Sequence, residues 1–137
     1  MCLGIFMEID KIALIFIKDR KALATVSKGK DVFYFPGGKR EEGEHDEQTL
    51  IREVKEELSV SLTPYTIKYY GTFRAQAHGK PIGTIVKMTC YTADFTGKPK
   101  ASSEIEKLLW VDSKDIKKAP PVDKIILEDL KSKNLID

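Results

Sequence analysis

The chain has 137 residues, 42% of them hydrophobic and 32% charged, and a formal net charge of +2. This length and composition predict one folded domain, residues 1–137, with a single hydrophobic core. The small net charge gives no reason to expect a nucleic-acid polymer or an anionic membrane as a partner. No apolar run reaches the roughly 20 residues that a membrane span requires.

The amino-terminal stretch "MCLGIFMEID" has neither a basic segment nor a long apolar segment, so it is not expected to act as a signal peptide. Cys2 and Cys90 form no cluster of the disulfide or metal-binding type. A reducing compartment, the cytoplasm, is therefore the expected location. Cys90 lies in an apolar run and is expected to be buried and unreactive.

The first predicted elements are strands. Residues 11–29 ("KIALIFIKDRKALATVSKG") place apolar, β-branched runs on either side of the polar turn "KDRK", which predicts a hairpin. Residues 31–38 ("DVFYFPGG") predict a short aromatic strand that ends at Pro36, because proline cannot continue the hydrogen-bonded ladder. Gly37 and Gly38, which follow, allow backbone angles closed to other residues.

The remaining elements alternate between helices and strands. Residues 44–58 predict a helix, and two strands are expected in residues 65–76 and 82–95, with the polar loop "AHGKP" between them. A shorter strand ends near Trp110, which is expected in the core. Residues 120–137 predict a second helix with a proline in its first turn. Its expected buried stripe comprises Ile125, Ile126, Leu127 and Leu130. This order predicts an α/β (α+β) fold, a mixed sheet between helices.

The first predicted helix concentrates negative charge on one side. Glu53, Glu56 and Glu57 share a helical face, centred roughly 120° from the apolar face. Carboxylates so close repel one another, so this arrangement does not stabilise the folded helix by itself. A divalent cation reverses this argument, since carboxylate oxygens suit Mg²⁺ or Mn²⁺. The ordinary alternative is a solvated surface helix rich in glutamate.

The loop before this helix has features of a phosphate site. Gly37 and Gly38 let the backbone approach a ligand, Lys39 adds a mobile cation, and a helix start can hold phosphate oxygens. Mg²⁺ commonly binds through a few carboxylates together with substrate phosphates. These features indicate metal-assisted attack of water on a polyphosphate. Taken alone, the Pro-Gly-Gly sequence is most often only a turn.

The spacing of these residues resembles the Nudix box, the signature of the MutT-related hydrolases. The box reads Gly, five residues, Glu, seven residues, and then Arg-Glu-aliphatic-x-Glu-Glu-x-Gly-aliphatic. A signature this long and widely spaced is highly specific. The chain departs from it at Ser59, which stands where the box has its last glycine, a left-handed residue after the helix. The matching residues are Gly38, Glu44, Arg52, Glu53, Val54, Glu56, Glu57 and Val60.

The resemblance implies a Nudix fold and roles for the box residues. Glu53, Glu56 and Glu57 would bind Mg²⁺, with Mn²⁺ as a substitute. Glu53 or Glu56 would also take the proton from the attacking water. Arg52, placed among the catalytic residues, would pair with Glu44 and hold the loop against the helix. The expected substrate contacts in the loop are Gly37, Gly38 and Lys39.

Two further candidates lie outside the box. Some family members carry a catalytic or metal-binding glutamate on a late loop before a tryptophan, and Glu104, ahead of Trp110, fits this better than Glu106. Asp123 follows "PPV", where triphosphate-directed relatives place an Asn or Asp that reads the edge of the base. The alternatives are an ordinary loop glutamate and a helix-capping aspartate.

The resemblance implies hydrolysis of a nucleoside diphosphate linked to another group. The first expectation is a ribo- or deoxyribonucleoside triphosphate, normal, modified or oxidised, cleaved to the monophosphate and pyrophosphate. The small size and the "APPVDK" stretch resemble the triphosphate-directed branch. The partner is then a small nucleotide, and the oligomeric state, monomer or homodimer, stays open.

Two alternatives to this function remain. One is an ADP-ribose or nucleotide-sugar pyrophosphatase, although residues 71–80 lack the proline that such members tend to carry. The other is a module of the same fold that senses a ligand without hydrolysing it. Such modules usually lose box carboxylates, and this chain keeps them.

Overall fold

The computed structural model describes residues 7–137. Cys2 and the first part of the stretch considered as a signal peptide lie outside the described residues. Between residues 7 and 137, no helix is long and apolar enough to cross a membrane. The elements are β1 (Met7–Leu14), β2 (Ile17–Lys18), β3 (Lys21–Ser27), β4 (Gly37–Lys39), α1 (Asp46–Leu58), β5 (Ser61–Leu62), the 3-10 helix η1 (Pro64–Thr66), β6 (Lys68–Gln76), β7 (Thr84–Thr92), β8 (Phe95–Thr96), β9 (Ile105–Val111), the 3-10 helix η2 (Ser113–Lys118) and α2 (Pro121–Ser132).

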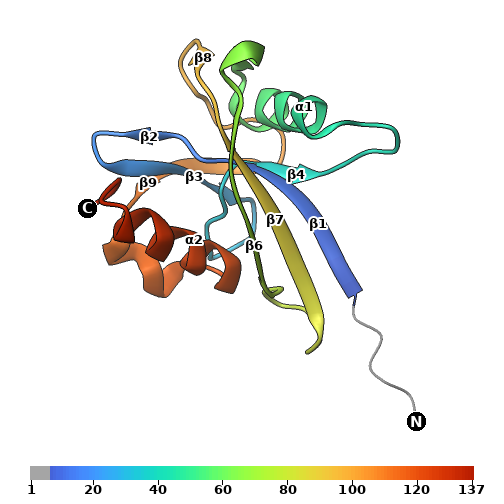
Figure 1. The fold of residues 1–137 in the computed structure, drawn as a ribbon, viewed down its shortest axis with the longest axis vertical. Helices are drawn as coiled ribbons and strands as arrows, with labels where there is room; N and C mark the ends of the chain where they lie inside the picture. The colour runs from blue at the N-terminus through green and yellow to red at the C-terminus, as the bar shows by residue number, and fades with distance from the viewer. Residues whose placement is uncertain (1–6) are drawn as a thin grey trace.

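The strands form one mixed sheet and two smaller antiparallel sheets. The largest has the order β4-β1-β7-β6, in which β1 and β7 run parallel and the other pairs antiparallel. The others have the order β2-β3-β9 and β5-β8. The helices α1 and α2 lie on opposite sides of these strands (Figure 1). The predicted α/β fold, a mixed sheet between helices, is therefore confirmed.

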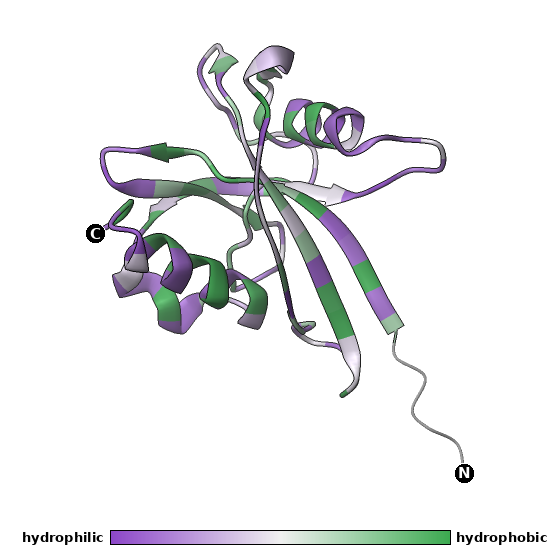
Figure 2. Cartoon of the chain, in the orientation of Figure 1, coloured by the Kyte–Doolittle hydropathy of each residue, from purple (hydrophilic) through white to green (hydrophobic). Residues whose placement is uncertain are grey.

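Strand alternation divides the interior into two apolar clusters. On β1, Ile12 and Leu14 belong to the cluster that contains the apolar face of α1, whereas Ala13 belongs to the cluster that contains that of α2. Successive strand side chains point to opposite faces, so one strand feeds both cores. Both helices are amphipathic (Figure 2). Their fully buried apolar residues are Leu50, Val54 and Leu58 on α1, and Ile126, Leu127 and Leu130 on α2.

The predicted hairpin is present, but its first strand is divided. The run before the "KDRK" turn splits into β1 and β2, which belong to different sheets. Asp19 and Arg20 form the tight turn between β2 and β3, with φ values of 52° and 63°. Left-handed angles at both central residues match the twist of a two-residue hairpin.

The aromatic strand predicted for residues 31–38 is wrong in its location. The segment before Pro36 has only one isolated bridge, between Thr25 and Tyr34. The strand β4 begins after the proline, at Gly37, and pairs with β1. A Cβ atom at Gly37 would lie 1.9 Å from the carbonyl oxygen of Ile12, so only glycine permits this close pairing.

The first helix starts at Asp46 rather than residue 44 and ends as the box spacing predicts. Ser59 adopts the left-handed conformation (φ 59°, ψ 28°), and its N–H donates to the carbonyl of Lys55. Its hydroxyl lies 3.1 Å from that of Ser102. Serine therefore takes the place of the usual glycine without moving the helix end.

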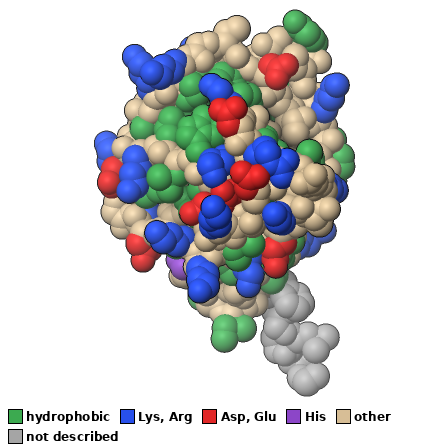
Figure 3. All heavy atoms as spheres, turned by 90° about the vertical axis from the view of Figure 1, so that its left-hand side faces the viewer, with side chains coloured by type: hydrophobic (Ala, Val, Ile, Leu, Met, Phe, Trp, Pro, Cys, Tyr) green, Lys and Arg blue, Asp and Glu red, His purple; other side chains and the backbone are tan. Residues whose placement is uncertain are grey.

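Two residues predicted for the core lie at the surface. Trp110 is 41% exposed and Ile125 is 39% exposed. Trp110 sits at the margin of the α1-side cluster against Phe16, with ring centroids 6.2 Å apart, because β9 is the edge strand of its sheet. Figure 3 shows the side of the molecule that carries the β2–β3 turn, where apolar and basic side chains adjoin. Cys90 is fully buried as predicted, and burial raises the pKa of its thiol.

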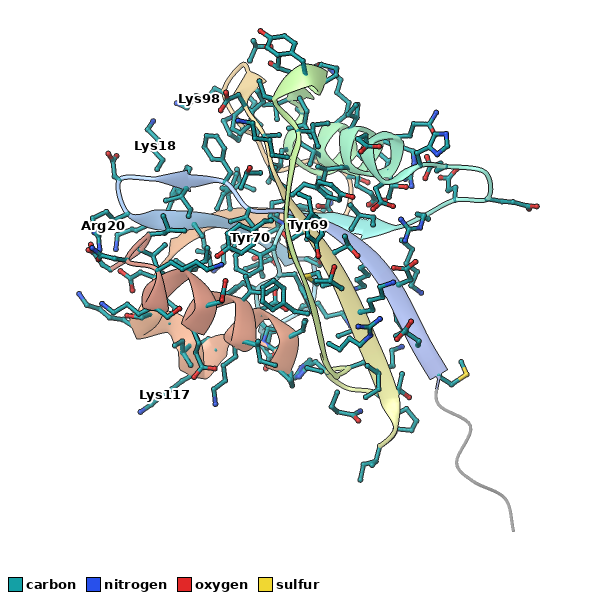
Figure 4. The ribbon with its side chains drawn as sticks, in the orientation of Figure 1. Lys18, Arg20, Tyr69, Tyr70, Lys98 and Lys117 are labelled. Carbon is teal, nitrogen blue, oxygen red and sulfur yellow. The ribbon has the colours of Figure 1, made fainter. Side chains whose placement is uncertain are left out.

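The second helix is anchored to the edge of the mixed sheet by polar contacts. The hydroxyl of Tyr70 on β6 donates to Asp129 at 2.6 Å, and the ammonium of Lys133 lies 4.5 Å from the Tyr70 ring centroid. Tyr70 lies beside α2 in Figure 4, whereas Tyr69 is 61% exposed. These contacts hold the C-terminal half of α2 against β6.

Candidate active site

A cleft of about 580 Å³ lies where β1, β4 and α1 meet. The loop before β9 supplies a further wall. The fold thus gathers all the predicted site residues around one space except Glu56 and Asp123. Those that line the cleft are Gly37, Gly38, Lys39, Arg52, Glu53, Glu57 and Glu104.

Glu57 lies at the bottom of this cleft and is only 7% exposed. Its Oε1 accepts a hydrogen bond of 2.9 Å from the backbone N–H of Gly37. Burial, with added repulsion from Glu53 and Glu104, raises the pKa of Glu57 to about 8. The alternative of a solvated surface helix therefore does not describe Glu57, because β4 covers it. A nearby cation would favour its charged form.

Glu53 lies directly against the glycine turn. A Cβ atom at Gly38 would fall 2.3 Å from the Oε2 atom of Glu53. The two glycines thus make room for protein groups, Gly37 for β1 and Gly38 for this carboxylate. Burial raises the pKa of Glu53, against the opposing effect of the guanidinium of Arg52.

Arg52 joins the loop to the helix. Its Nε donates to Glu44 at 2.7 Å, its Nη1 to Glu53 at 2.9 Å, and its Nη2 to the carbonyl of Lys39 at 3.1 Å. The hydrogen bond from Arg52, with one from the N–H of Glu41, lowers the pKa of Glu44 to about 2. The predicted pairing of Arg52 with Glu44 is present, and it also fixes the orientation of Glu53.

Glu56 stands apart from the other two helix carboxylates. Its side chain is 51% exposed and lies 3.6 Å from Arg52. Across residues 7–137, no three acidic, histidine or cysteine side chains converge closely enough to hold an ion by themselves. The donors present are hard oxygens, chiefly those of Glu53 and Glu57. They fit a Mg²⁺ or Mn²⁺ ion that shares its coordination with substrate phosphates.

The start of α1 does not contribute to the cleft, contrary to the prediction of a phosphate contact there. The N–H of His45 donates to Gln48, and Arg40 pairs with Asp46 in the first turn. Protein groups therefore already use this helix end. The phosphate-binding groups that remain are those at the end of β4, above all Lys39.

A smaller cavity of about 140 Å³ adjoins the cleft. Its outer rim includes His78 and Lys80 of the loop between β6 and β7, and its inner wall includes Asp123 of α2. The two spaces share part of their lining, so they lie next to each other. The shared residues are Lys11, Lys30, Tyr34 and Met88.

Asp123 is the buried carboxylate of this second cavity. It is fully buried; its Oδ2 accepts a hydrogen bond of 3.1 Å from the N–H of Phe35, and its Oδ1 has no partner among the described residues. Burial raises its pKa to about 7. Asp123 is not the cap of α2, which is Pro120, but it lies in the first turn of the helix, where an acidic side chain interacts favourably with the helix dipole. An unpaired buried oxygen at a cavity wall is a ready acceptor for a ligand.

Lys11 is the main site residue that sequence reasoning missed. It lies on β1 in phase with Ala13, whose side chain is buried in the α2-side cluster. A lysine at an inward position of a strand is unusual, since buried lysines are rare without a partner. The alternation of side chains along β1 could have identified Lys11 as an inward residue. This interpretation requires knowing which face of the strand points inward.

The comparisons with known proteins agree with this geometry. The family model described as "NUDIX domain" matches residues 8–130, and the chain therefore belongs to the Nudix family. The family comprises hydrolases that act on pyrophosphate bonds, and this chain keeps every charged residue of the box.

Individual relatives match the chain over 72% to 100% of its length. The uncharacterized Nudix hydrolase YvcI of Bacillus subtilis (strain 168) is 30% identical over 102 residues, or 74% of this chain and 65% of that protein. The mRNA-decapping enzyme subunit 2 of Saccharomyces cerevisiae (strain YJM789) is 35% identical over 98 residues, or 72% of this chain but 10% of that protein. The solution structure of the E. coli ORF135 protein is similar over the full length of both chains, with a TM-score of 0.71 and 26% identity.

Proposed function

We propose that the chain is a metal-dependent pyrophosphohydrolase of ribo- or deoxyribonucleoside triphosphates, including modified or oxidised ones, that releases the monophosphate and pyrophosphate. One observation carries this proposal: the cleft that holds Glu53 and Glu57 adjoins the cavity that holds Asp123, and both are lined by Lys11, Lys30, Tyr34 and Met88. A polyphosphate in the first space leaves the nucleoside in the second. Residues 1–137 act as one domain in this proposal, in the cytoplasm, on a small nucleotide rather than a nucleic-acid polymer.

The residues of the Nudix box have different roles in binding the metal and the phosphate groups. Glu53 and Glu57 hold Mg²⁺ or Mn²⁺ together with phosphate oxygens, and Glu56 adds a ligand at the exposed rim. When bound, the metal neutralises phosphate charge and supplies an acidified water. Arg52 orients Glu53. Lys39, at the cleft edge, contacts phosphate, as do backbone groups of the glycine turn.

The proton of the attacking water needs a carboxylate acceptor near the cleft. Glu53, Glu56 and Glu104 are the candidates for this general base. Glu104 lines the cleft opposite the helix carboxylates, and its charge reaches both Glu53 and Glu57. Glu106, two residues later, is exposed on β9 and does not line the cleft.

The nucleoside end depends on Asp123. Its free Oδ1 can accept a hydrogen bond from a base N–H group. A buried acceptor rejects a base that lacks the matching donor, because the acceptor would then stay unpaired. Asp123 therefore confers preference among bases, while the box confers catalysis.

The test is a hydrolysis screen of the purified protein with Mg²⁺ and, separately, with a chelator. The panel contains normal and oxidised nucleoside triphosphates, ADP-ribose, nucleotide sugars and, because of the yeast relative, a capped dinucleotide. Metal-dependent release of pyrophosphate and monophosphate supports the proposal. Preferred cleavage of ADP-ribose or of the capped dinucleotide would show that the substrate class is that compound's and not the nucleoside triphosphates. Binding without hydrolysis of any compound indicates the sensing module.

A further inference from the structure

Two lysines at the junction of the two cavities, Lys11 and Lys30, have no role in the proposal so far, and Lys30 is exposed to solvent. The side chain of Lys11 is half-buried and lines both the cleft and the smaller cavity. Its ammonium lies 5.3 Å from the centroid of the Tyr34 ring. Within residues 7–137, it makes neither a hydrogen bond nor an ion pair. A charge in this position is costly to bury unless something pairs with it.

The nearest acidic groups are engaged elsewhere. The carboxylates of Glu53 and Glu57 accept hydrogen bonds from Arg52 and from the N–H of Gly37, and that of Asp123 accepts one from Phe35. Burial lowers the pKa of Lys11, and the charge of Asp123 only partly opposes this effect. The protein therefore surrounds the ammonium with negative potential but gives it no direct partner.

A second lysine stands directly across from Lys11. In the register of β1 and β4, Lys11 is paired with Lys39, and both line the cleft. Like charges directly opposite on neighbouring strands destabilise a sheet. Neither ammonium group has a hydrogen-bonding or ionic partner among residues 7–137, and an anion that binds between them would explain why both lie on one face of the cleft.

The position of Lys11 indicates which phosphate group of a nucleotide would bind to it. The metal-binding carboxylates lie on the cleft side of it, and Asp123 lies on the cavity side. In a nucleoside polyphosphate, the phosphate between the nucleoside and the rest of the chain is the α-phosphate. We propose that Lys11 binds the α-phosphate, the group that stays on the nucleoside monophosphate product. This inference rests on the proposed function and adds a specificity residue to it.

The experiment measures binding by titration calorimetry in excess chelator, so that neither metal nor turnover enters. The probes are the four deoxynucleosides and their 5′-monophosphates. The wild-type protein is expected to prefer a monophosphate over its nucleoside. The variant Lys11→Met is expected to lose roughly tenfold or more in affinity for the monophosphate, as for a charge-assisted hydrogen bond. Its affinity for the nucleoside is expected to stay within about twofold of the wild type.

The matched control is Lys87→Met. Lys87 is on β7, next to the Met88 that pairs with Lys11, so its side chain points to the other face of the same sheet and lines neither cavity. It should bind both kinds of probe like the wild type. The variant Lys11→Arg keeps the charge and should retain part of the preference for the monophosphate. The ³¹P resonance gives a second readout, because Lys11 should lower the second phosphate pKa of the bound monophosphate and Lys11→Met should not.

The outcomes separate this inference from the proposed function. If Lys11→Met binds the monophosphate as tightly as the wild type, Lys11 does not contact the phosphate. If affinity for nucleoside and monophosphate falls equally, Lys11 shapes the pocket or reads the base, and the inference is again overturned. If the wild-type protein binds none of the probes and hydrolyses no nucleotide, the proposed function itself fails. A misfolded Lys11→Met shifts the test to Lys11→Arg and the ³¹P titration of the wild-type complex.

Discussion

The cleft and the smaller cavity share one feature: in each, a buried carboxylate on a helix accepts a hydrogen bond from the segment 35–37. Glu57 reaches this segment from α1 and accepts from the N–H of Gly37. Asp123 reaches it from α2, on the other side of the sheet, and accepts from the N–H of Phe35. Burial raises the pKa of the first to about 8 and of the second to about 7.

The surroundings of the two carboxylates differ. Glu57 lies among other acids, Glu53 and Glu104, whose repulsion adds to the effect of burial. Asp123 lies among apolar residues of the α2-side cluster, and the cation that acts on it is Lys11. Crowded carboxylates call for a metal ion, whereas an isolated one with a free oxygen suits a hydrogen-bond donor. The same local geometry thus supports catalysis at one end and recognition at the other.

The strongest test of this comparison is Glu57→Gln. The amide keeps the acceptor for the N–H of Gly37 but removes a charge that the metal needs, so kcat should fall on the order of a hundredfold or more. Thermal unfolding in chelator should show no loss of stability, because the neutral amide also removes the cost of ionising a buried acid. The control is Glu47→Gln, an exposed residue in the first turn of α1. Undiminished turnover of Glu57→Gln, or of the wild type in chelator, would contradict the metal assignment.

A second test asks whether Glu104, in the loop before β9, acts together with Glu53 and Glu57. If Glu104 acts on the water or the metal, Glu104→Gln should lower kcat roughly tenfold to a hundredfold with little change in KM. Glu106→Gln, two positions away and outside the cleft, is the matched control and should leave both constants unchanged. Steady-state kinetics on the best triphosphate decides between them. A larger loss of kcat in Glu106→Gln than in Glu104→Gln would assign the role of general base or metal ligand to Glu106. If neither variant changes kcat, a carboxylate of the Nudix box has that role.

The third test addresses recognition. Asp123→Asn keeps the shape of the side chain but replaces one acceptor oxygen with a donor, so the preference among bases should change by about tenfold in kcat/KM. The rate on the best remaining substrate should fall less than in Glu57→Gln. Competition assays with the four bases measure this, and Glu128→Gln, exposed on the same helix, serves as the control. An unchanged order of substrates would remove Asp123 from the site.

The last test concerns stability and needs no substrate. Because the folded-state pKa of Asp123, about 7, lies above the value near 4 expected for the unfolded chain, the folded state holds this proton more tightly. Wild-type stability should therefore fall, relative to Asp123→Asn, as the pH rises from about 4 to about 7, by about 4 kcal/mol. Above that range the difference should stay constant. Urea unfolding in chelator across this range measures it, and parallel curves would show that Asp123 does not titrate in this way.

The sequence was sufficient where a feature depends on neighbours along the chain. The helical spacing of Leu50, Val54 and Leu58 predicted the buried face of α1, and the resemblance to the Nudix box implied the pairing of Arg52 with Glu44. The helical pattern also predicted Leu58 as the last residue of the helix. These contacts form within a loop and the helix that follows it, so local periodicity and chain length restrict them strongly.

The tertiary structure alone decided how segments distant in sequence face one another. Pairing with β1, and not local propensity, made Gly37–Lys39 a strand and left the aromatic segment before it without one. The same pairing buried Glu57 and set Lys11 opposite Lys39. The docking of α2 decided that Asp123 is buried in a cavity wall and that Ile125 is not buried. Which face of a strand or helix is covered depends on its partners across the fold, and a single sequence carries no direct record of that pairing.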